Sequence, residues 1–394
     1  MHGKRIVYIG TYTEPILFGT GQVLQGKGKG IYAYAFDERD GCMEYLGMTE
    51  GIVNPSYIAF GVDGATLYTI NEMKTWYGQP TGTVSAYRIG AKPSELRLLN
   101  LRATMGTDPC HLVLDRSQRY VAVANFRTGS IAIYPLMADG SLGEHTAFVQ
   151  HTGSSVDPKR QAGPHAHAVI FDPYNRYLLV PDLGIDKVVV YAFDASTGSV
   201  VLEEAKSIPV AAGAGPRSLE YHPSGKFAYL INELNSTVTV LRVTGGTPFM
   251  EEFQTISTLP DGYSGASTCA DIHITPSGEF LYASNRGHDS LAIFAIDAKT
   301  GALTPKGHVS TLGKIPRNFA IDPSGRFVLA ANQDTDNIVI FGIDEKSGLL
   351  KYTGNQIEVP TPVCVQFAPR AQPTRRLPLR AIRALPAYRP TARQ

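Results

Sequence analysis

A short segment that recurs seven times constrains the fold of this sequence more than any other feature. Most copies begin beside a Pro or a His, and several end in Asp-Pro, His-Pro, Thr-Pro or Ala-Pro. The copies are 55–60, 109–115, 167–173, 216–223, 270–276, 316–323 and 362–369, with a spacing of roughly 46–55 residues. Regular spacing in this range is typical of repeat folds, in which each repeat is one supersecondary unit.

Two further segments recur in step with the first. An apolar segment follows the first six copies, and its seventh counterpart lies at the N-terminus, at 6–11. A third segment occurs at 31–36, 84–89, 131–136, 188–193, 238–243, 291–296 and 338–343. A weaker fourth strand follows, for example at 96–101. Alternating β-branched and aromatic residues bounded by Gly, Pro and Asp predict β-strands, and no window has the periodicity of an amphipathic helix.

Seven units of four short strands predict an all-β fold, a seven-bladed β-propeller with four antiparallel strands in each blade. The first strand of one blade is C-terminal and its other strands are N-terminal. We therefore expect the ring to be closed by mixing N- and C-terminal strands in one blade. The alternative, a large protein of two β-sandwich domains, does not explain seven copies in phase.

The charge balance argues against a nucleic-acid-binding protein. Lys and Arg number 36 and Asp and Glu 35, but residues 370–394 carry seven Arg and no acidic residue. The rest of the chain is therefore slightly acidic and lacks a basic footprint. We expect 1–369 to form a single propeller domain and the Arg-rich segment 370–394 to be a disordered tail.

The sequence also predicts a protein of the cytoplasm. It has no apolar run of the length that spans a membrane, and its first residues do not resemble a signal peptide. The four cysteines, Cys42, Cys110, Cys269 and Cys364, are scattered without CxxC spacing. Reduced thiols fit this pattern best.

Strand order predicts where functional residues gather. In an antiparallel sheet, the start of the first strand and the end of the second lie at the same edge. Around the channel this edge collects polar residues that the repeat itself does not require: His111, Asn125, His165, His167, Asp182, Arg217, Glu233, Asn285, Arg286, Arg317 and Asn332. Such residues at otherwise equivalent positions indicate a functional site.

We predict His165, His167, Glu233, Arg217 and Arg286 as catalytic residues. Gly163-Pro-His165-Ala-His167 places two histidines at i and i+2, and we favour a general base or an oxyanion donor for at least one. A metal ligand and a structural histidine are the alternatives. Glu233 can orient a histidine, act as a base or neutralise an arginine. The absence of a carboxylate cluster disfavours a metal ion, so we expect no metal and no other cofactor.

We predict His111, Arg317, Asn285, Asp182 and Asn332 as substrate-binding residues. Arginine forks suit carboxylate or phosphate oxygens, so Arg217, Arg286 and Arg317 indicate a small anionic ligand. Pairing of these arginines with Glu233, Asp182 or Asp289 is the structural alternative. Asn recurs at the end of the second segment, for example at Asn125, Asn285 and Asn332. Capping of turns explains this recurring Asn column better than contact with a substrate does.

Residues 13–30 form a long insertion on the same face. Its segment 21–27 nearly matches a phosphate-binding loop, but Gly28 stands where Ser or Thr is required and no helix pattern follows. We reject a nucleotide site. A flexible lid that carries Lys27 and Lys29, or a plain long hairpin, remains.

The motifs resemble those of the seven-bladed propeller lactonase family. The shared motifs are Gly10-Thr-Tyr-Thr13, Pro109-Cys-His-Leu112, Gly163-Pro-His-Ala-His167, Asp182-Leu-Gly-x-Asp186, Gly215-Pro-Arg217, Asn232-Glu-Leu234, Ser284-Asn-Arg-Gly-x-Asp-Ser290, Pro316-Arg317 and Ala331-Asn-Gln333. They span about 4–369. The family includes propeller-type 6-phosphogluconolactonases and fungal 3-carboxy-cis,cis-muconate lactonizing enzymes. The resemblance implies a metal-free enzyme with the Pro-His-Ala-His histidine, Arg217, Glu233 and Arg286 at its site.

Three functions follow as hypotheses. The first is hydrolysis of a sugar-acid lactone, foremost 6-phosphogluconolactone, with water activated by a His or Glu233 and the anion held by Arg. The second is cycloisomerisation of a carboxylated muconate, for which the same groups fit. The third is a non-enzymatic binding platform. A metal-dependent sugar lactonase is a further alternative. We expect no nucleic-acid or membrane partner, and the sequence does not give the oligomeric state.

Overall fold

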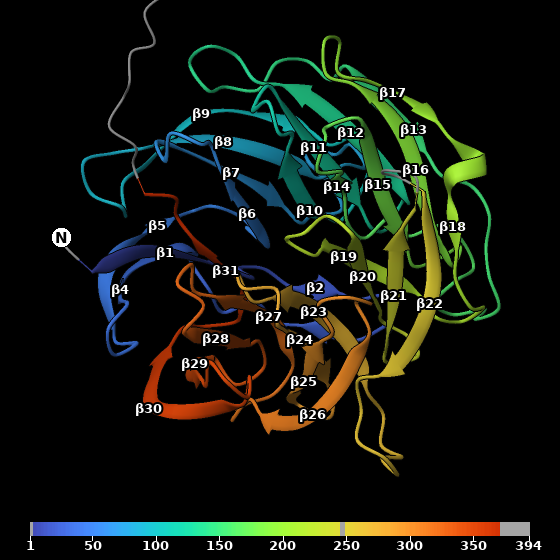
Figure 1. Ribbon diagram of the computed structural model, residues 1–394. Helices are drawn as coiled ribbons and strands as arrows, with labels where there is room; N and C mark the ends of the chain where they lie inside the picture. The colour runs from blue at the N-terminus through green and yellow to red at the C-terminus, as the bar shows by residue number, and fades with distance from the viewer. Residues whose placement is uncertain (1–2, 245–248, 371–394) are drawn as a thin grey trace, which may run out of the picture.

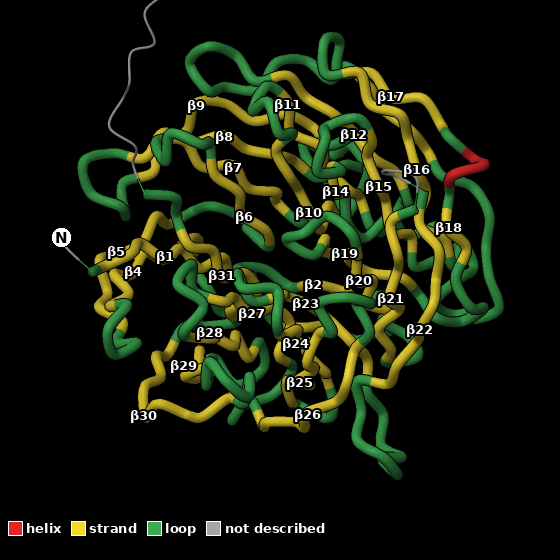
Figure 2. Tube along the Cα trace, viewed as in Figure 1, coloured by secondary structure: helices red, strands yellow, loops and turns green. Residues whose placement is uncertain are grey.

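Each repeat forms one antiparallel sheet, and the seven sheets surround a central channel as the blades of a propeller (Figure 1). The structure is a computed structural model that describes residues 3–244 and 249–370. The predicted all-β class and the seven blades are therefore confirmed. In the described residues, the one helix is a single 3₁₀ turn, η1 (Glu204–Lys206), which lies at the rim of the ring (Figure 2).

The first four blades follow the chain. Blade 1 contains β6 (Tyr57–Phe60), β7 (Thr66–Asn71), β8 (Thr83–Ile89) and β9 (Leu96–Ala103). Blade 2 contains β10 (Pro109–Leu114), β11 (Tyr120–Asn125), β12 (Ser130–Pro135) and β13 (Ala147–Gln150). Blade 3 contains β14 (Ile170–Phe171), β15 (Tyr177–Asp182), β16 (Lys187–Asp194) and β17 (Ser199–Leu202), and β18 (Ile208–Pro209) pairs with β16. Blade 4 contains β19 (Pro216–Tyr221), β20 (Phe227–Asn232), β21 (Thr237–Val243) and β22 (Met250–Ser257).

The remaining blades complete the ring. Blade 5 contains β23 (Thr268–Ile274), β24 (Phe280–Arg286), β25 (Ser290–Ile296) and β26 (Leu303–Ser310). Blade 6 contains β27 (Pro316–Ile321), β28 (Phe327–Asn332), β29 (Asn337–Ile343) and β30 (Leu350–Glu358). Blade 7 has the order β31 (Pro362–Phe367), β1 (Lys4–Thr11), β4 (Gly30–Asp37) and β5 (Met43–Glu50). A separate hairpin, β2 (Ile16–Leu17) and β3 (Val23–Leu24), lies between β1 and β4.

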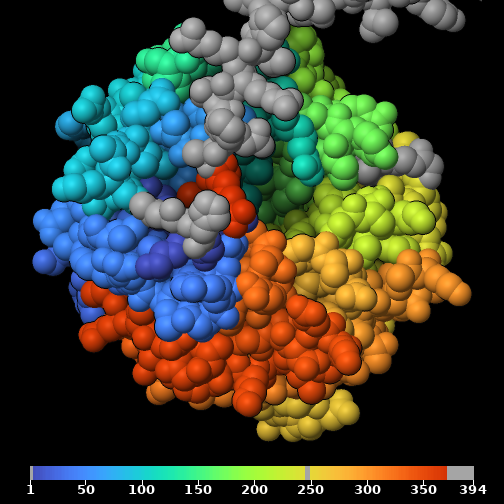
Figure 3. Space-filling model, turned by 60° about the vertical axis from the view of Figure 1, so that its left-hand side comes forward, coloured from blue at the N-terminus to red at the C-terminus, as the bar shows by residue number. Residues whose placement is uncertain are grey.

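Blade 7 closes the ring as predicted, because β31 pairs with β1 over Phe367 to Pro362. Blue N-terminal and red C-terminal surfaces consequently lie side by side in Figure 3. Gly10 is required at this closure, since a Cβ on it would lie 2.0 Å from the carbonyl oxygen of Pro55. The division into a 1–369 domain and a tail stays a prediction. The predicted disorder concerns residues outside the described ones, except Arg370, whose Nη2 donates to Glu38 Oε2 at 2.8 Å.

The core is divided among the interfaces between blades. Seven apolar clusters each join two neighbouring blades, for example Phe171 of blade 3 with Ile133 of blade 2. The second strand of a blade is buried along its whole length in β7, β11, β20 and β28. The outermost strands are only partly buried, as in β5, which has no fully buried residue. This burial pattern leaves the channel mouth as the place where polar side chains converge.

Candidate active site

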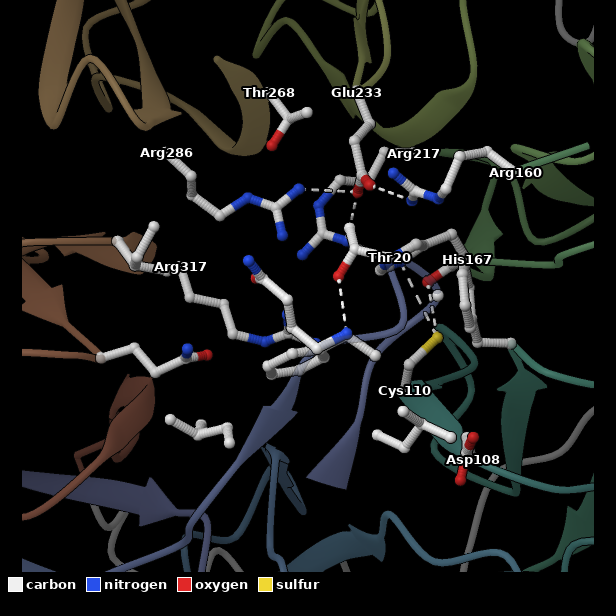
Figure 4. Close-up of a pocket in the computed structure, with 18 of the residues that line it drawn as sticks. Thr20, Asp108, Cys110, Arg160, His167, Arg217, Glu233, Thr268, Arg286 and Arg317 are labelled. Carbon is white, nitrogen blue, oxygen red and sulfur yellow. Dashed lines mark hydrogen bonds and ion pairs between the residues drawn. The ribbon is translucent and has the colours of Figure 1, made fainter. Parts of the chain in front are cut away.

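A cavity of about 640 Å³ opens at the edge where first strands begin and second strands end (Figure 4). This is the edge that strand order predicts. Its polar lining comes from blades 1 to 6 and from the loop that carries Arg160: Glu72, Asp108, Arg127, Arg160, His167, Arg217, Glu233, Ser267, Thr268, Arg286, Arg317, Gln333 and Asp334. The tip of the β2–β3 hairpin, including Phe18 and Thr20, forms part of the wall.

β-Bulges aim several of these side chains inward. The register between β19 and β20 shifts between Pro216 and Ser218, which makes Arg217 the extra residue. The same shift after Pro316 in β27 makes Arg317 the extra residue, and the shift after Pro109 does the same for Cys110. A bulge kinks one strand and redirects the extra side chain. The bulge that follows the first-strand proline therefore turns Arg217 and Arg317 toward the cavity.

Three arginines converge on the carboxylate of Glu233. Its Oε1 lies 2.5 Å from Arg160 Nη2, and its Oε2 lies 2.9 Å from Arg286 Nη2 and 3.4 Å from Arg217 Nη1. Burial alone would raise the pKa of Glu233, but Arg286, Arg217 and Arg160 hold it well below the ordinary value. A carboxylate with so low a pKa is a poor acceptor for a proton near neutrality. The geometry thus favours neutralisation of arginine among the predicted roles of Glu233.

Arg217 also fixes the state of His167. Arg217 Nη1 lies within hydrogen-bonding distance of the His167 ring. Burial and the charge of Arg217 lower the pKa of His167 well below 6.5, so the imidazole is neutral at neutral pH. Burial lowers the pKa of Arg217 to about 10, which still leaves it cationic. His167 consequently serves as a neutral hydrogen-bonding group on the cavity wall.

Arg317 is held by aromatic rings. Its guanidinium carbon lies 5.5 Å from the centroid of Tyr12 and 5.4 Å from that of Phe18, at cation–π distance. Its nearest carboxylate is Glu72, at 4.0 Å, and Glu72 accepts a 2.9 Å hydrogen bond from the Tyr12 hydroxyl. Four largely buried arginines thus meet two carboxylates, Glu233 and Glu72. The surplus of positive charge on this wall favours an anionic ligand.

The insertion is a hairpin that reaches the cavity. Its tip packs Phe18 against Tyr12, with ring centroids 6.0 Å apart. Lys27 and Lys29 do not line the cavity; Lys27 Nζ lies 2.5 Å from Asp336 Oδ2, and Lys29 lies 3.9 Å from Glu50. The hairpin therefore contributes apolar and hydroxyl groups to the site, while its two lysines make ion pairs elsewhere.

His111 lies in a smaller polar cavity of about 40 Å³ beneath the first. The two cavities share Glu72, Cys110, His167, Arg217 and Arg317 as lining residues. Burial lowers the pKa of His111 to about 4, and its Nδ1 accepts a hydrogen bond from Val169 N at 3.3 Å. His111 is thus a neutral residue beneath the floor of the large cavity.

Below this cavity, His273 is held between two carboxylates. Its Nδ1 lies 3.0 Å from Glu220 and its Nε2 lies 3.2 Å from Asp271, while its ring packs on Phe319. Burial alone would lower the pKa of His273, but Asp271 and Glu220 raise it well above 6.5. The folded protein therefore stabilises the imidazolium.

We predict a pH-dependent stability loss for His273→Gln. A raised pKa contributes stability that is fully present below the unfolded value of about 6.5 and is lost as pH rises through the folded pKa. Urea unfolding of both proteins at pH about 5.5 and about 9 measures this. The difference in free energy of unfolding should be larger at the lower pH. An equal difference at both values would contradict the imidazolium.

Other predicted residues lie outside both cavities. Asp182 is fully buried and binds His151 Nδ1 at 2.7 Å and the backbone N of His165 at 2.6 Å. His165 stacks on Phe126, and its Nδ1 lies 2.9 Å from the Phe126 carbonyl oxygen. These contacts position the loop that carries His167, so we do not retain His165 or Asp182 in the proposed machinery.

The Asn column also lies outside the cavity lining. Asn125, Asn285 and Asn332 each donate from Nδ2 to a backbone carbonyl oxygen at the end of the preceding blade, at 2.8–2.9 Å. These bonds link Asn285 and Asn332 to the preceding blade, and the two residues leave the set of proposed substrate contacts.

Arg160 and Asp108 line the cavity but are not among the residues predicted from the sequence. Arg160 lies in the loop before His165 and occupies no repeat position, so the repeat contained no signal for it. Asp108 directly precedes Pro109 of β10, at a position that recurs before other first strands. A charged residue at that recurring position was a signal that could have been used.

Metal-ligating clusters and membrane-spanning helices also bear on the functional hypotheses. Within residues 3–244 and 249–370, no group of three or more His, Cys, Asp and Glu side chains is arranged to hold a metal ion. In the same residues, no helix has the length and apolar character needed to cross a membrane.

Comparison with known proteins identifies the family. The family model described as "Lactonase, 7-bladed beta-propeller" matches residues 6–367. A 6-phosphogluconolactonase of Bacillus subtilis is 36% identical over 92% of this chain and 98% of its own length. The solved structure of a putative 6-phosphogluconolactonase from Bacteroides fragilis is 36% identical with a TM-score of 0.83, covering 93% of this chain and 98% of that one. A periplasmic gluconolactonase of Pseudomonas aeruginosa is 34% identical with a TM-score of 0.84, covering 93% and 99%. The chain belongs to the seven-bladed β-propeller lactonase family.

Proposed function

We propose that the protein hydrolyses the lactone of an anionic sugar acid, foremost 6-phosphogluconolactone, to the open-chain acid. The observation that carries the proposal is the convergence of Arg160, Arg217, Arg286 and Arg317 on one cavity, where these four arginines make ion pairs with two carboxylates, Glu233 and Glu72. Arginine forks bind phosphate and carboxylate oxygens in two-point contacts. Relatives that carry the name 6-phosphogluconolactonase support this substrate. The reaction would place the protein in the pentose phosphate pathway.

The chain's own residues supply two parts of this chemistry. The arginines hold the anionic group of the substrate and stabilise the oxyanion that forms when water attacks the lactone carbonyl. Neutral His167, held by Arg217, adds a hydrogen bond at the cavity wall. We propose Arg217, Arg286 and Arg317 as substrate contacts, and Glu233 as the group that positions three arginines.

The other hypotheses have less support. Cycloisomerisation of a carboxymuconate requires similar charges, but the relatives described above are named for 6-phosphogluconolactone or gluconolactone chemistry. A binding platform does not account for an ion-paired cluster inside a cavity of this size. Location in the cytoplasm stays a prediction from the sequence. Cell fractionation would test it against a location in the periplasm, since the Pseudomonas relative is a periplasmic gluconolactonase.

Substrate preference tests the proposal. We expect kcat/KM for fresh 6-phosphogluconolactone to exceed that for unphosphorylated gluconolactone by at least about tenfold, since one charged contact is worth about 1.5–3 kcal/mol. EDTA should leave both rates unchanged. Equal kcat/KM values would contradict recognition of the phosphate group, and loss of activity in EDTA would contradict metal-independent hydrolysis.

A further inference from the structure

Asp108 differs from the other carboxylates of the large cavity in having a free side chain. Glu233 is paired with three arginines, Glu72 accepts from Tyr12, and the exposed Asp334 accepts from Gln333. Within the described residues, the carboxylate of Asp108 has no hydrogen bond or ion pair, although the residue is only 7% exposed. Because Asp108 lines the cavity, this unpartnered carboxylate can accept a hydrogen bond from water or from a bound molecule there.

The repeat provides an internal comparison for this position. The residue before the proline that leads into or begins the first strand has a left-handed backbone in five blades: Asn54, Asp108, Gly215, Ile315 and Thr361, with φ between 40° and 65°. In blade 1, the Asn54 side chain binds the backbone of Thr13 and Glu14. In blade 7, the Thr361 hydroxyl binds Tyr12, Lys27 and Gly28. Asp108 makes no such contact, so the scaffold role of this position does not explain its carboxylate.

The surroundings of Asp108 keep it able to accept a proton near neutrality. Burial, and after it the charge of Glu72, raises the pKa of Asp108 to about 6, while Lys74 and Arg127 oppose the shift. Its backbone is fixed on both sides, because its N donates to Met73 O at 3.0 Å and its O accepts from Phe126 N at 2.9 Å. Figure 4 places Asp108 on the side of the cavity opposite Arg286 and Glu233. A bound molecule can therefore lie between the arginines and this carboxylate.

We propose that Asp108 is the general base that activates water for attack on the lactone carbonyl. The inference rests on the proposed lactonase function. The water oxygen forms a bond to the carbonyl carbon while Asp108 takes one water proton. The tetrahedral oxyanion, stabilised by arginine, then collapses and breaks the bond between that carbon and the ring oxygen. The ring oxygen takes the proton from Asp108, which regenerates the carboxylate, and the new carboxylic acid ionises into solvent.

Asp108→Asn is the central variant, since Asn tolerates a left-handed backbone and removes only the proton acceptor. We expect kcat to fall about 10²–10⁴-fold, with KM within a few-fold of the wild-type value. Asp108→Glu should retain measurable activity. Asp261→Asn is the matched control, because Asp261 is an exposed residue of the loop that precedes β23, as Asp108 ends the loop that precedes β10. Its kcat should equal that of the wild type.

The pH profile separates a base from a structural residue. Unphosphorylated gluconolactone is the substrate of choice here, because a phosphate group itself titrates near pH 6. In the wild type, kcat/KM should rise with pH through about 6 and then level off, because kcat/KM reports the pKa values of the free enzyme. The Asn variant should lack this rise. Carboxyl signals in a ¹³C NMR titration should show a group with this pKa in the wild type that is missing in the variant, which gives a readout besides activity.

The outcomes distinguish this inference from the proposed function. If the wild type hydrolyses the lactone and Asp108→Asn keeps kcat within about threefold, or keeps the rise near pH 6, the base is another group, such as His167. If the wild type does not accelerate hydrolysis of any lactone, both proposals are overturned. Thermal unfolding of each variant shows whether a loss of activity comes from misfolding, and in that case Asp108→Glu and the NMR titration decide.

Discussion

Replacing Glu233 with Gln is expected to lower the free energy of unfolding by about 3–5 kcal/mol, because removing one member of a buried ion cluster leaves the others uncompensated. Arg160, Arg217 and Arg286 all contact this carboxylate, and Glu233 is 3% exposed. Three cations would then lie together in a site of low polarity. Urea unfolding monitored by fluorescence measures the loss.

Glu44→Gln is the control for this experiment. Glu44 pairs with Lys4 at 2.6 Å, but both side chains are exposed, so its loss should lower the free energy of unfolding far less than the loss of Glu233. The two variants remove the same charge and differ in burial. A Glu233→Gln protein with the same free energy of unfolding as the wild type would contradict this structural role of Glu233.

Replacing Arg286 with Ala is expected to raise KM for 6-phosphogluconolactone by about 30- to 1,000-fold, which corresponds to the roughly 2–4 kcal/mol cost of removing one partner of a buried charged contact. Arg286 lines the cavity, and its Nε is buried without a hydrogen-bond partner among the described residues. The guanidinium faces the cavity (Figure 4), where an anionic ligand can contact it. Steady-state kinetics with fresh substrate measures the change.

Two comparisons make the Arg286 result specific. KM for unphosphorylated gluconolactone should change much less, because that substrate lacks the phosphate group. Arg97→Ala, at an exposed position of β9, should leave both KM values unchanged. An unaltered KM for the phosphorylated lactone in Arg286→Ala would exclude Arg286 as the phosphate contact.

The fold could be predicted from the sequence because a propeller repeats its signal. Each of the seven copies of the alternating segment predicts one strand, so a weak pattern in one copy is corrected by comparison with the other six. The N-terminal position of 6–11 and the C-terminal position of 362–369 then allow one closure, which the pairing of β1 with β31 confirms. Such redundancy is absent from a fold built of unlike elements.

The site could be predicted only in part. Strand order correctly placed Arg217, Glu233 and Arg286 at one edge, because edge position follows from topology. The same rule collected Asp182 and Asn285, although their side chains point into turns and loops. Edge position does not fix the direction of a side chain; in this protein the bulges after Pro216 and Pro316 do so for Arg217 and Arg317. Arg160 enters from a loop whose path no repeat pattern specifies.

The most direct test of the account is the rate of proton release from freshly made 6-phosphogluconolactone, followed in a pH-stat against the spontaneous ring opening of the same solution. The account predicts base uptake that rises in proportion to enzyme concentration, persists in EDTA and ends when one proton has been released for each lactone. A rate equal to the spontaneous one at every enzyme concentration would contradict it, and the arginine-lined cavity would then be a binding site for anions without hydrolytic activity.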